Sequence, residues 1–367
     1  MPEDAPSYLR WAKTRPRARF DLAGSGVPAV GVDEMGGLGR QQDLEIRGAY
    51  GDPELIEAIA AFRGVAADRV MPLPGTSMAN FIALACSASA GDRVLIESPG
   101  YDPLVRAAGF LHLEPMRFER DPARHHAPDL EAVRRGLDAG ARAVMMTNLH
   151  NPSGLRCPDE ELRRLAVLTA DHGAKLIIDE VYLDYAVINA GQDRPSAAGR
   201  GELGSHVITT DSLTKVYGLG GLRAGWMIAD PAMLGRAGDV LDVLNVVNPV
   251  VSARVATRAI GQMGRLAERC REMYRAGHSV YASWVDSRDD VVGYGHDGAL
   301  FGWLRLESGV GADRLAALLV ERYETLVVPG TYFGSKGHIR IGFGLPGDEL
   351  SQGLDRVGSA LDELRRG

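Results

Sequence analysis

Between Arg69 and Met227 the sequence alternates short apolar runs with stretches of helical periodicity. This alternation predicts parallel strands joined by crossover helices, because a parallel pair needs a connection of about a dozen residues or more. The helical stretches include Met78–Ser89 and Pro158–Asp171. The predicted fold class is α/β, with a mostly parallel central sheet. The expected strands are Val70–Leu73, Arg93–Glu97, Ala143–Thr147, Lys175–Ile178, His206–Thr210 and Ala224–Ile228.

The pattern changes after Pro249. We expect one long helix over Val250–Val285, broken near Gly261 or Gly264. It is followed by expected strands at Ala299–Leu306, Thr325–Val328 and His338–Phe343, and by expected helices near Asp313–Tyr323 and Leu350–Leu364. The predicted organisation is an N-terminal arm on the small-domain and substrate side at 1–34, a large cofactor domain at 35–248 and a small α+β domain at 249–367.

Composition and charge narrow the class of function. The net charge is −7, and no basic block offsets it, so nucleic acid is not an expected partner. No apolar run is long enough to cross a membrane, and the acidic start Met1–Asp4 is not followed by a signal-peptide pattern. An odd number of widely spaced cysteines favours a reducing cytoplasm over a disulfide framework. These are Cys86, Cys157 and Cys270.

The segment Ser212–Arg223 carries the most specific chemistry. The hydroxyl of Ser212 and the planar guanidinium of Arg223 can bind a phosphate. Lys215, beside them, is placed to condense with a carbonyl group. Phosphate, carbonyl and lysine together describe pyridoxal phosphate held as a Schiff base. Taken alone, the segment also fits a surface loop with a solvated lysine.

A second phosphate contact is expected where a strand turns into a helix at Pro74–Met78. Gly75 allows the backbone to approach a ligand closely. Thr76 and Ser77 stand at the helix start, where free N–H groups and the helix dipole favour an anion. A plain capped turn is the alternative for this segment.

Asp179 ends the apolar strand that begins at Lys175. A carboxylate is costly to bury without a cationic partner. A protonated pyridine nitrogen is such a partner, and Asp179 would keep it protonated so that the ring can accept electrons. The alternatives are a metal ligand or a helix cap, although no histidine or cysteine stands nearby in the sequence.

Two further patterns are set aside. The glycines of the lysine segment suggest a dinucleotide loop, but Arg223 stands where G-x-G-x-x-G requires its third glycine. His125 and His126 lie in a polar loop before Pro128, with no third ligand at metal spacing. We expect these histidines to be exposed rather than to bind zinc.

The segment Ser212–Arg223 resembles the lysine loop of class I/II aminotransferases, which are fold type I pyridoxal-phosphate enzymes. Asn148–Gly154 resembles the Asn-Pro-Thr-Gly motif of that family, with serine in place of threonine and Leu149 where a proline is common. The resemblance extends from about Asp21 to Leu364 and covers nearly the whole chain. It implies the fold type I architecture and pyridoxal 5'-phosphate as cofactor.

The resemblance also implies roles for individual residues. Tyr101 would stack on the pyridine ring, and Asn151 and Tyr182 would contact its phenolate oxygen. Arg340, alone among apolar neighbours in its strand, would bind the substrate α-carboxylate as a bidentate pair, with Asn151 nearby. The expected catalytic residues are Lys215, Asp179 and Tyr182.

Two matches are looser. Gly26, within Ala23–Pro28, would lie against the same carboxylate. Tyr50, within Ala49–Leu55, would reach the cofactor phosphate of the neighbouring subunit, so the resemblance implies a homodimer.

The implied activity is transfer of an amino group between an L-amino acid and a 2-oxo acid, with Lys215 as the cofactor-binding residue. The same cofactor set also serves decarboxylases and cyclising synthases, which the sequence separates poorly because these enzymes share the cofactor contacts. A regulatory module with a DNA-binding segment is the third alternative. We expect it least, because the residues before Asp21 are too few for a helix-turn-helix.

Overall fold

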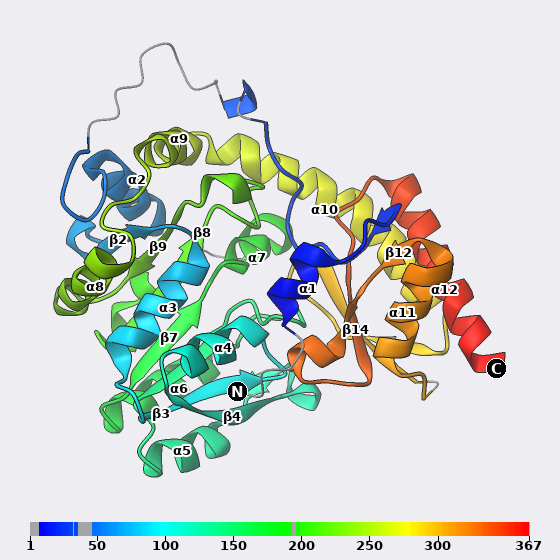
Figure 1. Ribbon diagram of the computed structural model, residues 1–367, viewed down its shortest axis with the longest axis horizontal. Helices are drawn as coiled ribbons and strands as arrows, with labels where there is room; N and C mark the ends of the chain where they lie inside the picture. The colour runs from blue at the N-terminus through cyan, green and yellow to red at the C-terminus, as the bar shows by residue number, and fades with distance from the viewer. Residues whose placement is uncertain (1–6, 32, 36–45, 193–195, 308, 367) are drawn as a thin grey trace.

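The computed structural model describes residues 7–31, 33–35, 46–192, 196–307 and 309–366. Within these residues the chain forms a larger and a smaller lobe, which lie side by side in Figure 1. No helix in these ranges is long and apolar enough to cross a membrane. The expectation for Met1–Asp4 lies outside the described residues, as do parts of the expected arm and of the start of the large domain.

An eight-stranded sheet forms the centre of the larger lobe. Five neighbouring strands run parallel, whereas β9 is antiparallel to both of its neighbours and β5 is antiparallel to β4. The predicted mostly parallel sheet is confirmed. In spatial order the strands are β2 (Val70–Leu73), β9 (Gly225–Ile228), β8 (Val207–Ser212), β7 (Lys175–Asp179), β6 (Ala143–Thr147), β3 (Arg93–Ser98), β4 (Glu114–Asp121) and β5 (Ala127–Pro128).

Sequence patterning missed the two strands at one edge of this sheet. β4 reads Glu-Pro-Met-Arg-Phe-Glu-Arg-Asp and is partly exposed, so it lacks the apolar run of a central strand. β5 is only a two-residue strand. Both strands form through hydrogen bonds to neighbouring strands, and their own sequences do not show a strand pattern.

Helices cover both faces of the sheet (Figure 1). α3, α4 and α8 share one apolar cluster with the sheet, and α5 and α6 share another. Local signals start several of them: the side chain of Asp129 caps α5, and three acidic residues occupy the first turn of α6. The helices are α2 (Pro53–Arg63), α3 (Thr76–Ser87), α4 (Asp102–Phe110), α5 (Leu130–Asp138), α6 (Asp159–Asp171), α7 (Leu183–Ala190) and α8 (Pro231–Leu244).

The smaller lobe follows two consecutive helices. α9 (Val250–Ile260) and α10 (Met263–Asp286) separate at Gly261, which confirms the predicted break in the long helical segment. Beyond them, an antiparallel sheet packs with two helices. Its strands, in spatial order, are β10 (Val291–Gly293), β11 (Phe301–Leu306), β14 (His338–Gly342) and β13 (Val328–Pro329), and its helices are α11 (Ala312–Tyr323) and α12 (Gly347–Arg366).

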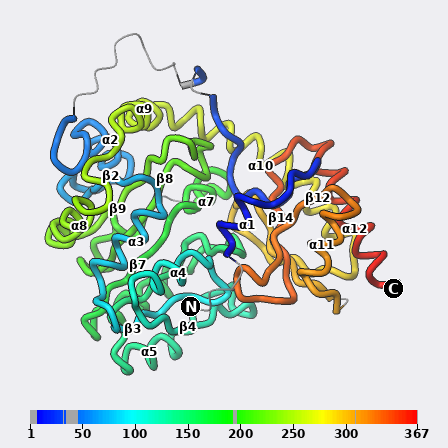
Figure 2. Tube along the Cα trace, in the orientation of Figure 1, coloured from blue at the N-terminus to red at the C-terminus, as the bar shows by residue number. Residues whose placement is uncertain are grey.

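The prediction of a single strand at Thr325–Val328 is wrong. β12 (Thr325–Leu326) pairs in parallel with β1 (Phe20–Asp21), whereas β13 pairs with β14. The segment divides because its two halves hydrogen-bond to different partners on either side of Val327. In Figure 2 the blue N-terminal trace runs from α1 (Tyr8–Thr14), between the lobes, to β1 beside β12. The domain boundaries at 34/35 and 248/249 stay predictions.

Candidate active site

The carboxyl ends of three parallel strands and the start of α3 border a cavity of about 600 Å³. β6 ends at Thr147, β7 at Asp179 and β8 at Ser212, and all three residues line it. This edge is the usual place for a ligand in an open α/β sheet. The cavity is lined by Tyr8, Leu9, Ala12, Lys13, Thr76, Ser77, Asn80, Tyr101, Thr147, Asn151, Asp179, Val181, Tyr182, Ser212, Thr214, Lys215 and Arg223.

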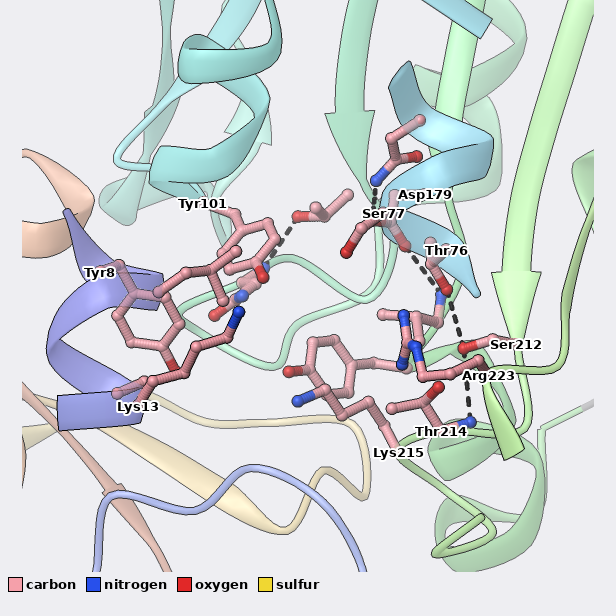
Figure 3. A pocket seen from close by; sticks show the side chains of 17 residues that line it. Tyr8, Lys13, Thr76, Ser77, Tyr101, Asp179, Ser212, Thr214, Lys215 and Arg223 are labelled. Atoms are coloured by element: carbon pink, nitrogen blue, oxygen red, sulfur yellow. Dashed lines mark hydrogen bonds between the residues drawn. The ribbon is translucent and has the colours of Figure 1, made fainter. Parts of the chain in front are cut away.

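The cavity brings together most of the residues that sequence analysis selected (Figure 3). Nine of them line it: Thr76, Ser77, Tyr101, Asn151, Asp179, Tyr182, Ser212, Lys215 and Arg223. The other four are outside its lining and are Gly75, Gly26, Arg340 and Tyr50.

Hydroxyl and guanidinium donors gather at one end of the cavity (Figure 3). Thr76 Oγ1 donates a hydrogen bond of 2.8 Å to Ser212 Oγ, and Arg223 Nη2 donates one of 3.2 Å to the carbonyl of Pro74. Gly75 has a φ of +85° and adjoins Arg223 so closely that an added Cβ would collide with its guanidinium. The first N–H groups of α3 have no partner inside the helix and form the positive end of its dipole. These donors suit a phosphate group.

Asp179 is the one acidic residue in the lining, and the residue is 3% exposed. Asn80 Nδ2 donates to Oδ2 at 2.7 Å, and the backbone N–H of Val181 donates to Oδ1 at 3.0 Å. Burial raises the pKa of Asp179 to about 6, although these hydrogen bonds and the nearby Lys215 oppose the rise. The ionised carboxylate is therefore short of positive charge, and a cationic ring nitrogen would supply it.

The N-terminal loop holds the lysine segment from one side. The N–H of Val27 donates to the carbonyl of Lys215 at 2.8 Å, and a Cβ added at Gly26 would lie 3.2 Å from that same oxygen. The hydroxyls of Ser25 and Tyr182 are 2.8 Å apart. Gly26 thus contacts the main chain of Lys215, and its expected contact with a substrate carboxylate stays a prediction.

Arg340 extends from β14 and is fully buried. Its Nη1 donates to Asn151 Oδ1 at 2.7 Å, and its Nη2 donates to Tyr8 Oη at 2.8 Å. The guanidinium also lies 5.0 to 5.2 Å from the ring centres of Phe333 and Phe301. Arg340 is therefore joined to the cavity through two of its lining residues.

Helix α1 forms one wall of the cavity, and Figure 3 shows it on the side away from Ser212 and Arg223. The ring of Tyr8 meets the ring of Tyr101 edge to face, with centres 5.7 Å apart. Burial raises the pKa of Tyr101 well above its usual range, so its hydroxyl stays protonated. Lys13 extends its side chain into the same space.

Tyr50 lies away from the cavity. Its hydroxyl donates to Asp242 Oδ2 at 3.0 Å, and the residue is 39% exposed. The contact with Asp242 raises the pKa of Tyr50 above its usual range. Its expected place in the site of a neighbouring subunit stays a prediction.

A buried ion-pair network contacts the segment Ser212–Arg223, which carries Lys215. Arg63 binds both carboxylate oxygens of Asp184, at 2.8 and 2.9 Å, and also binds Asp211. Asp211 Oδ1 accepts a hydrogen bond of 2.6 Å from the N–H of Ser212, and Tyr217 Oη donates to Asp184 at 2.6 Å. The network fixes the main chain on both sides of Lys215.

Sequence analysis missed eight of the lining residues, among them Asn80 and Tyr8, which contact Asp179 and Arg340. Asn80 had a readable signal, because it is a polar residue one turn into an otherwise apolar helix. Tyr8 had none: its contact with Arg340 joins residues 332 positions apart.

The prediction that both adjacent histidines are exposed is wrong for His126, which is 1% exposed. Its ring packs 5.1 Å from the rings of His150 and Tyr294, and burial lowers its pKa to about 4. No group of potential metal ligands occurs among the described residues. The three cysteines are free thiols, and burial raises the pKa of Cys157 to about 11, so this thiol is a poor nucleophile.

The cavity fits pyridoxal phosphate on its own chemistry. The donors around Ser212 and Arg223 suit the phosphate, the buried Asp179 suits a protonated ring nitrogen, and Lys215 supplies the amine that the cofactor carbonyl requires. The glycine at position 75 leaves room beside the guanidinium. All these groups line one cavity or adjoin it.

Comparisons with known proteins agree with this chemistry. The family Aminotransferase class I and II matches residues 25–357. Capreomycidine synthase of Streptomyces vinaceus is 29% identical and covers 96% of this chain and 92% of its own length. Aspartate aminotransferase of Streptomyces avermitilis is 25% identical, with 86% and 81% covered. The solved structure of the PLP-dependent cyclase OrfR has a TM-score of 0.86 at 25% identity and covers 99% of this chain and 98% of its own.

The family match spans most of the chain, and the fold and the cofactor-binding chemistry fit it. The chain therefore belongs to the class I and II aminotransferases, the pyridoxal-phosphate-dependent enzymes of fold type I.

Proposed function

We propose that this enzyme moves an amino group between an L-amino acid and a 2-oxo acid, with Lys215 as the residue that binds the cofactor and carries the proton. One observation carries the proposal. Lys215, Asp179 and the phosphate donors line a single cavity, and the guanidinium of Arg340 binds the lining residue Asn151. The amine of Lys215, the carboxylate of Asp179, the phosphate donors and the expected carboxylate-binding arginine are therefore close to one another.

Pyridoxal phosphate, when bound, supplies a carbonyl carbon that amines attack and a ring that accepts the electron pair left at the substrate α-carbon. The chain supplies the binding groups. Asp179 holds a proton on the ring nitrogen, and Ser77, Ser212 and Arg223 bind the phosphate. Tyr182, with Ser25 at 2.8 Å, offers a hydroxyl donor to the ring oxygen.

Arg340 and Lys215 act on the amino acid. Arg340 binds its carboxylate and thereby fixes the orientation of the α-carbon. Lys215 Nζ takes up the proton that leaves this carbon and holds it until it is returned. The donor leaves as a 2-oxo acid, whose keto oxygen comes from water, and the amino group passes to the second oxo acid.

Cyclisation of an amino acid is the second candidate reaction. It is favoured by the names of two similar proteins, a capreomycidine synthase and the PLP-dependent cyclase OrfR. Such a reaction uses the same cofactor contacts but consumes no oxo acid. The products, rather than the cofactor site, separate the two candidates.

The test is a panel of amino acids with 2-oxoglutarate or pyruvate as acceptor. Transamination predicts one new 2-oxo acid and one new amino acid in equal amounts. Without acceptor it predicts no new amino acid and at most one equivalent of 2-oxo acid per active site. A cyclised product that forms without consumption of acceptor would replace our proposal with the second candidate. Release of carbon dioxide would identify a decarboxylase.

The role of Lys215 has its own test. Borohydride reduction of the wild-type enzyme, followed by peptide mass spectrometry, is expected to place a pyridoxyl group on Lys215. Lys215→Ala should lose transamination and remain folded, whereas Lys336→Ala, at an exposed lysine, should keep both activity and labelling. Full activity in Lys215→Ala would refute the proposal.

A further inference from the structure

The guanidinium of Arg340 is buried without a carboxylate partner. Among the described residues no acidic side chain forms an ion pair with it, and its Nε has no hydrogen-bond partner. Its other contacts are Asn151 Oδ1, Tyr8 Oη and aromatic rings. A buried cation is costly without an anion and a full set of acceptors, so this residue lacks a ligand.

One edge of the Arg340 guanidinium has a donor that lacks a hydrogen-bond acceptor. In a planar guanidinium, Nε–H and the nearer Nη2–H point the same way and match the two oxygens of a carboxylate. In Arg340 the Nη2 position on this edge is taken by the single oxygen of Tyr8, while Nε is unpartnered. Tyr8 therefore accepts from one of the two donors on this edge, whereas a carboxylate could accept from both.

Tyr8 is carried by a short helix at the cavity wall. α1 has seven residues, and three others of its side chains, Leu9, Ala12 and Lys13, line the same cavity. The helix is attached through aromatic contacts, such as Trp11 with Tyr332 at 5.1 Å, and through the Tyr8 N–H, which donates to Asp102 at 3.3 Å. Ring packing therefore holds α1 in place, and a movement of the helix has to break these contacts.

We propose that the hydroxyl of Tyr8 is a stand-in for the substrate α-carboxylate: it caps Arg340 in the absence of an amino acid, and the carboxylate displaces it and moves α1. This inference rests on the proposed function, because it assigns the carboxylate to Arg340. It implies that an amine without a carboxylate leaves Tyr8 on Arg340. The Tyr8 hydroxyl then lowers the affinity for amino acids, and movement of α1 reports the arrival of a carboxylate before any chemical step.

The test uses two probes that differ only in the carboxylate. 2-Aminoisobutyrate has no α-proton to lose, and isopropylamine is the same molecule with hydrogen in place of the carboxylate. Both are titrated into the holoenzyme and followed by the absorbance of the cofactor. Cleavage by trypsin after Lys13 reports the movement of α1.

Tyr8→Phe removes the competing oxygen and keeps the ring. The dissociation constant of 2-aminoisobutyrate should fall about tenfold, because a hydrogen bond to a charged group no longer has to be broken. The constant for isopropylamine should not change. In the wild type, 2-aminoisobutyrate but not isopropylamine should speed cleavage after Lys13. Tyr332→Phe, in the same aromatic cluster, should match the wild type throughout.

Weaker or unchanged binding of 2-aminoisobutyrate to Tyr8→Phe would overturn the inference. A rate of tryptic cleavage after Lys13 that is the same with and without 2-aminoisobutyrate would also overturn it. Arg340→Lys separates this failure from failure of the proposed function. If Arg340→Lys abolishes binding while Tyr8→Phe leaves it unchanged, only the role of Tyr8 is wrong. If Arg340→Lys binds 2-aminoisobutyrate as well as the wild type does, or if neither probe perturbs the wild-type cofactor, the carboxylate site itself is wrong.

Discussion

Asn80 donates a hydrogen bond of 2.7 Å to Asp179, and this contact joins the first turns of α3 to the end of β7. Asn80 Oδ1 in turn accepts from the hydroxyl of Thr210 on β8, at 2.5 Å. The amide therefore fixes the carboxylate relative to α3, the helix at which we propose that the phosphate binds. This geometry gives Asp179 a defined direction into the cavity and makes its ionisation testable.

Asp179→Asn should retain the cofactor but lower turnover by several orders of magnitude. Without the carboxylate the ring nitrogen loses its proton, and the electron pair at the α-carbon is no longer accepted efficiently. Steady-state kcat and cofactor retention on gel filtration are the measurements. Turnover near that of the wild type would make Asp179 a structural cap instead.

The same substitution should change the pH dependence of stability in the cofactor-free protein. The folded pKa of Asp179, about 6, lies above the unfolded value, so the stabilisation is complete below about pH 4 and is lost as pH rises through 6. The free energy of unfolding in urea should fall by ~2 kcal/mol less in Asp179→Asn than in the wild type between pH 4 and 7. Equal slopes would contradict the raised pKa. Burial also raises the pKa of Glu180, to about 7. Glu180 is present in both proteins, so its contribution cancels from the difference between them.

Arg63→Met should destabilise the protein by about 3–5 kcal/mol, because it leaves the carboxylates of Asp184 and Asp211 buried without their cation. Cofactor affinity should fall as well, since Asp211 holds the N–H of Ser212. Urea unfolding and cofactor titration measure the two effects. The matched control is Arg142→Met, at an exposed arginine with a 3.9 Å ion pair, which should change stability by less than about 1 kcal/mol. A similar small loss in Arg63→Met would show that the network is not needed.

Lys13→Glu should shift the substrate preference from acidic toward basic amino donors. Lys13 is one of three cationic residues in a lining with a single carboxylate, and we expect the other two, Lys215 and Arg223, to bind the cofactor. Because Lys13 is exposed to solvent, the ratio of kcat/KM for glutamate to that for ornithine should fall only about tenfold. Lys336→Glu is the charge-matched control. An unchanged ratio would mean that Lys13 does not contribute to recognition of the substrate side chain.

The active unit should be a homodimer in which Tyr50 completes the site of the partner. Tyr50 is exposed on its own subunit and lies outside its own cavity. Mixing Lys215→Ala with Tyr50→Phe subunits should restore activity and tight cofactor binding, because one site of the mixed dimer then carries neither defect. If heterodimers form and nothing is restored, Tyr50 acts within its own subunit or has no role.

Much of the fold and many of the site residues could be read from local sequence. The buried parallel strands form near-continuous apolar runs, and polar residues such as Asp179 and Ser212 end them at one edge of the sheet. Lys215 follows three residues after Ser212, so the strand pattern together with the chemistry of these residue types placed the main groups of the cavity. Short-range patterning is strong at these positions because each strand is buried on both faces.

Other features depend on pairings that no local pattern encodes. β4 and β5 lie at one edge of the large sheet and lack an apolar run, and the segment at Thr325 divides between two sheets because its halves meet different partners. His126 is buried because its ring packs against His150 and against Tyr294 of the smaller lobe. The contact of Tyr8 with Arg340 joins the first helix to the last strand. The residue types and their places on strands were determined by the sequence itself. Which oxygen meets which guanidinium was decided by the packing of distant segments, because hydrogen bonds between them form only once both lobes are folded.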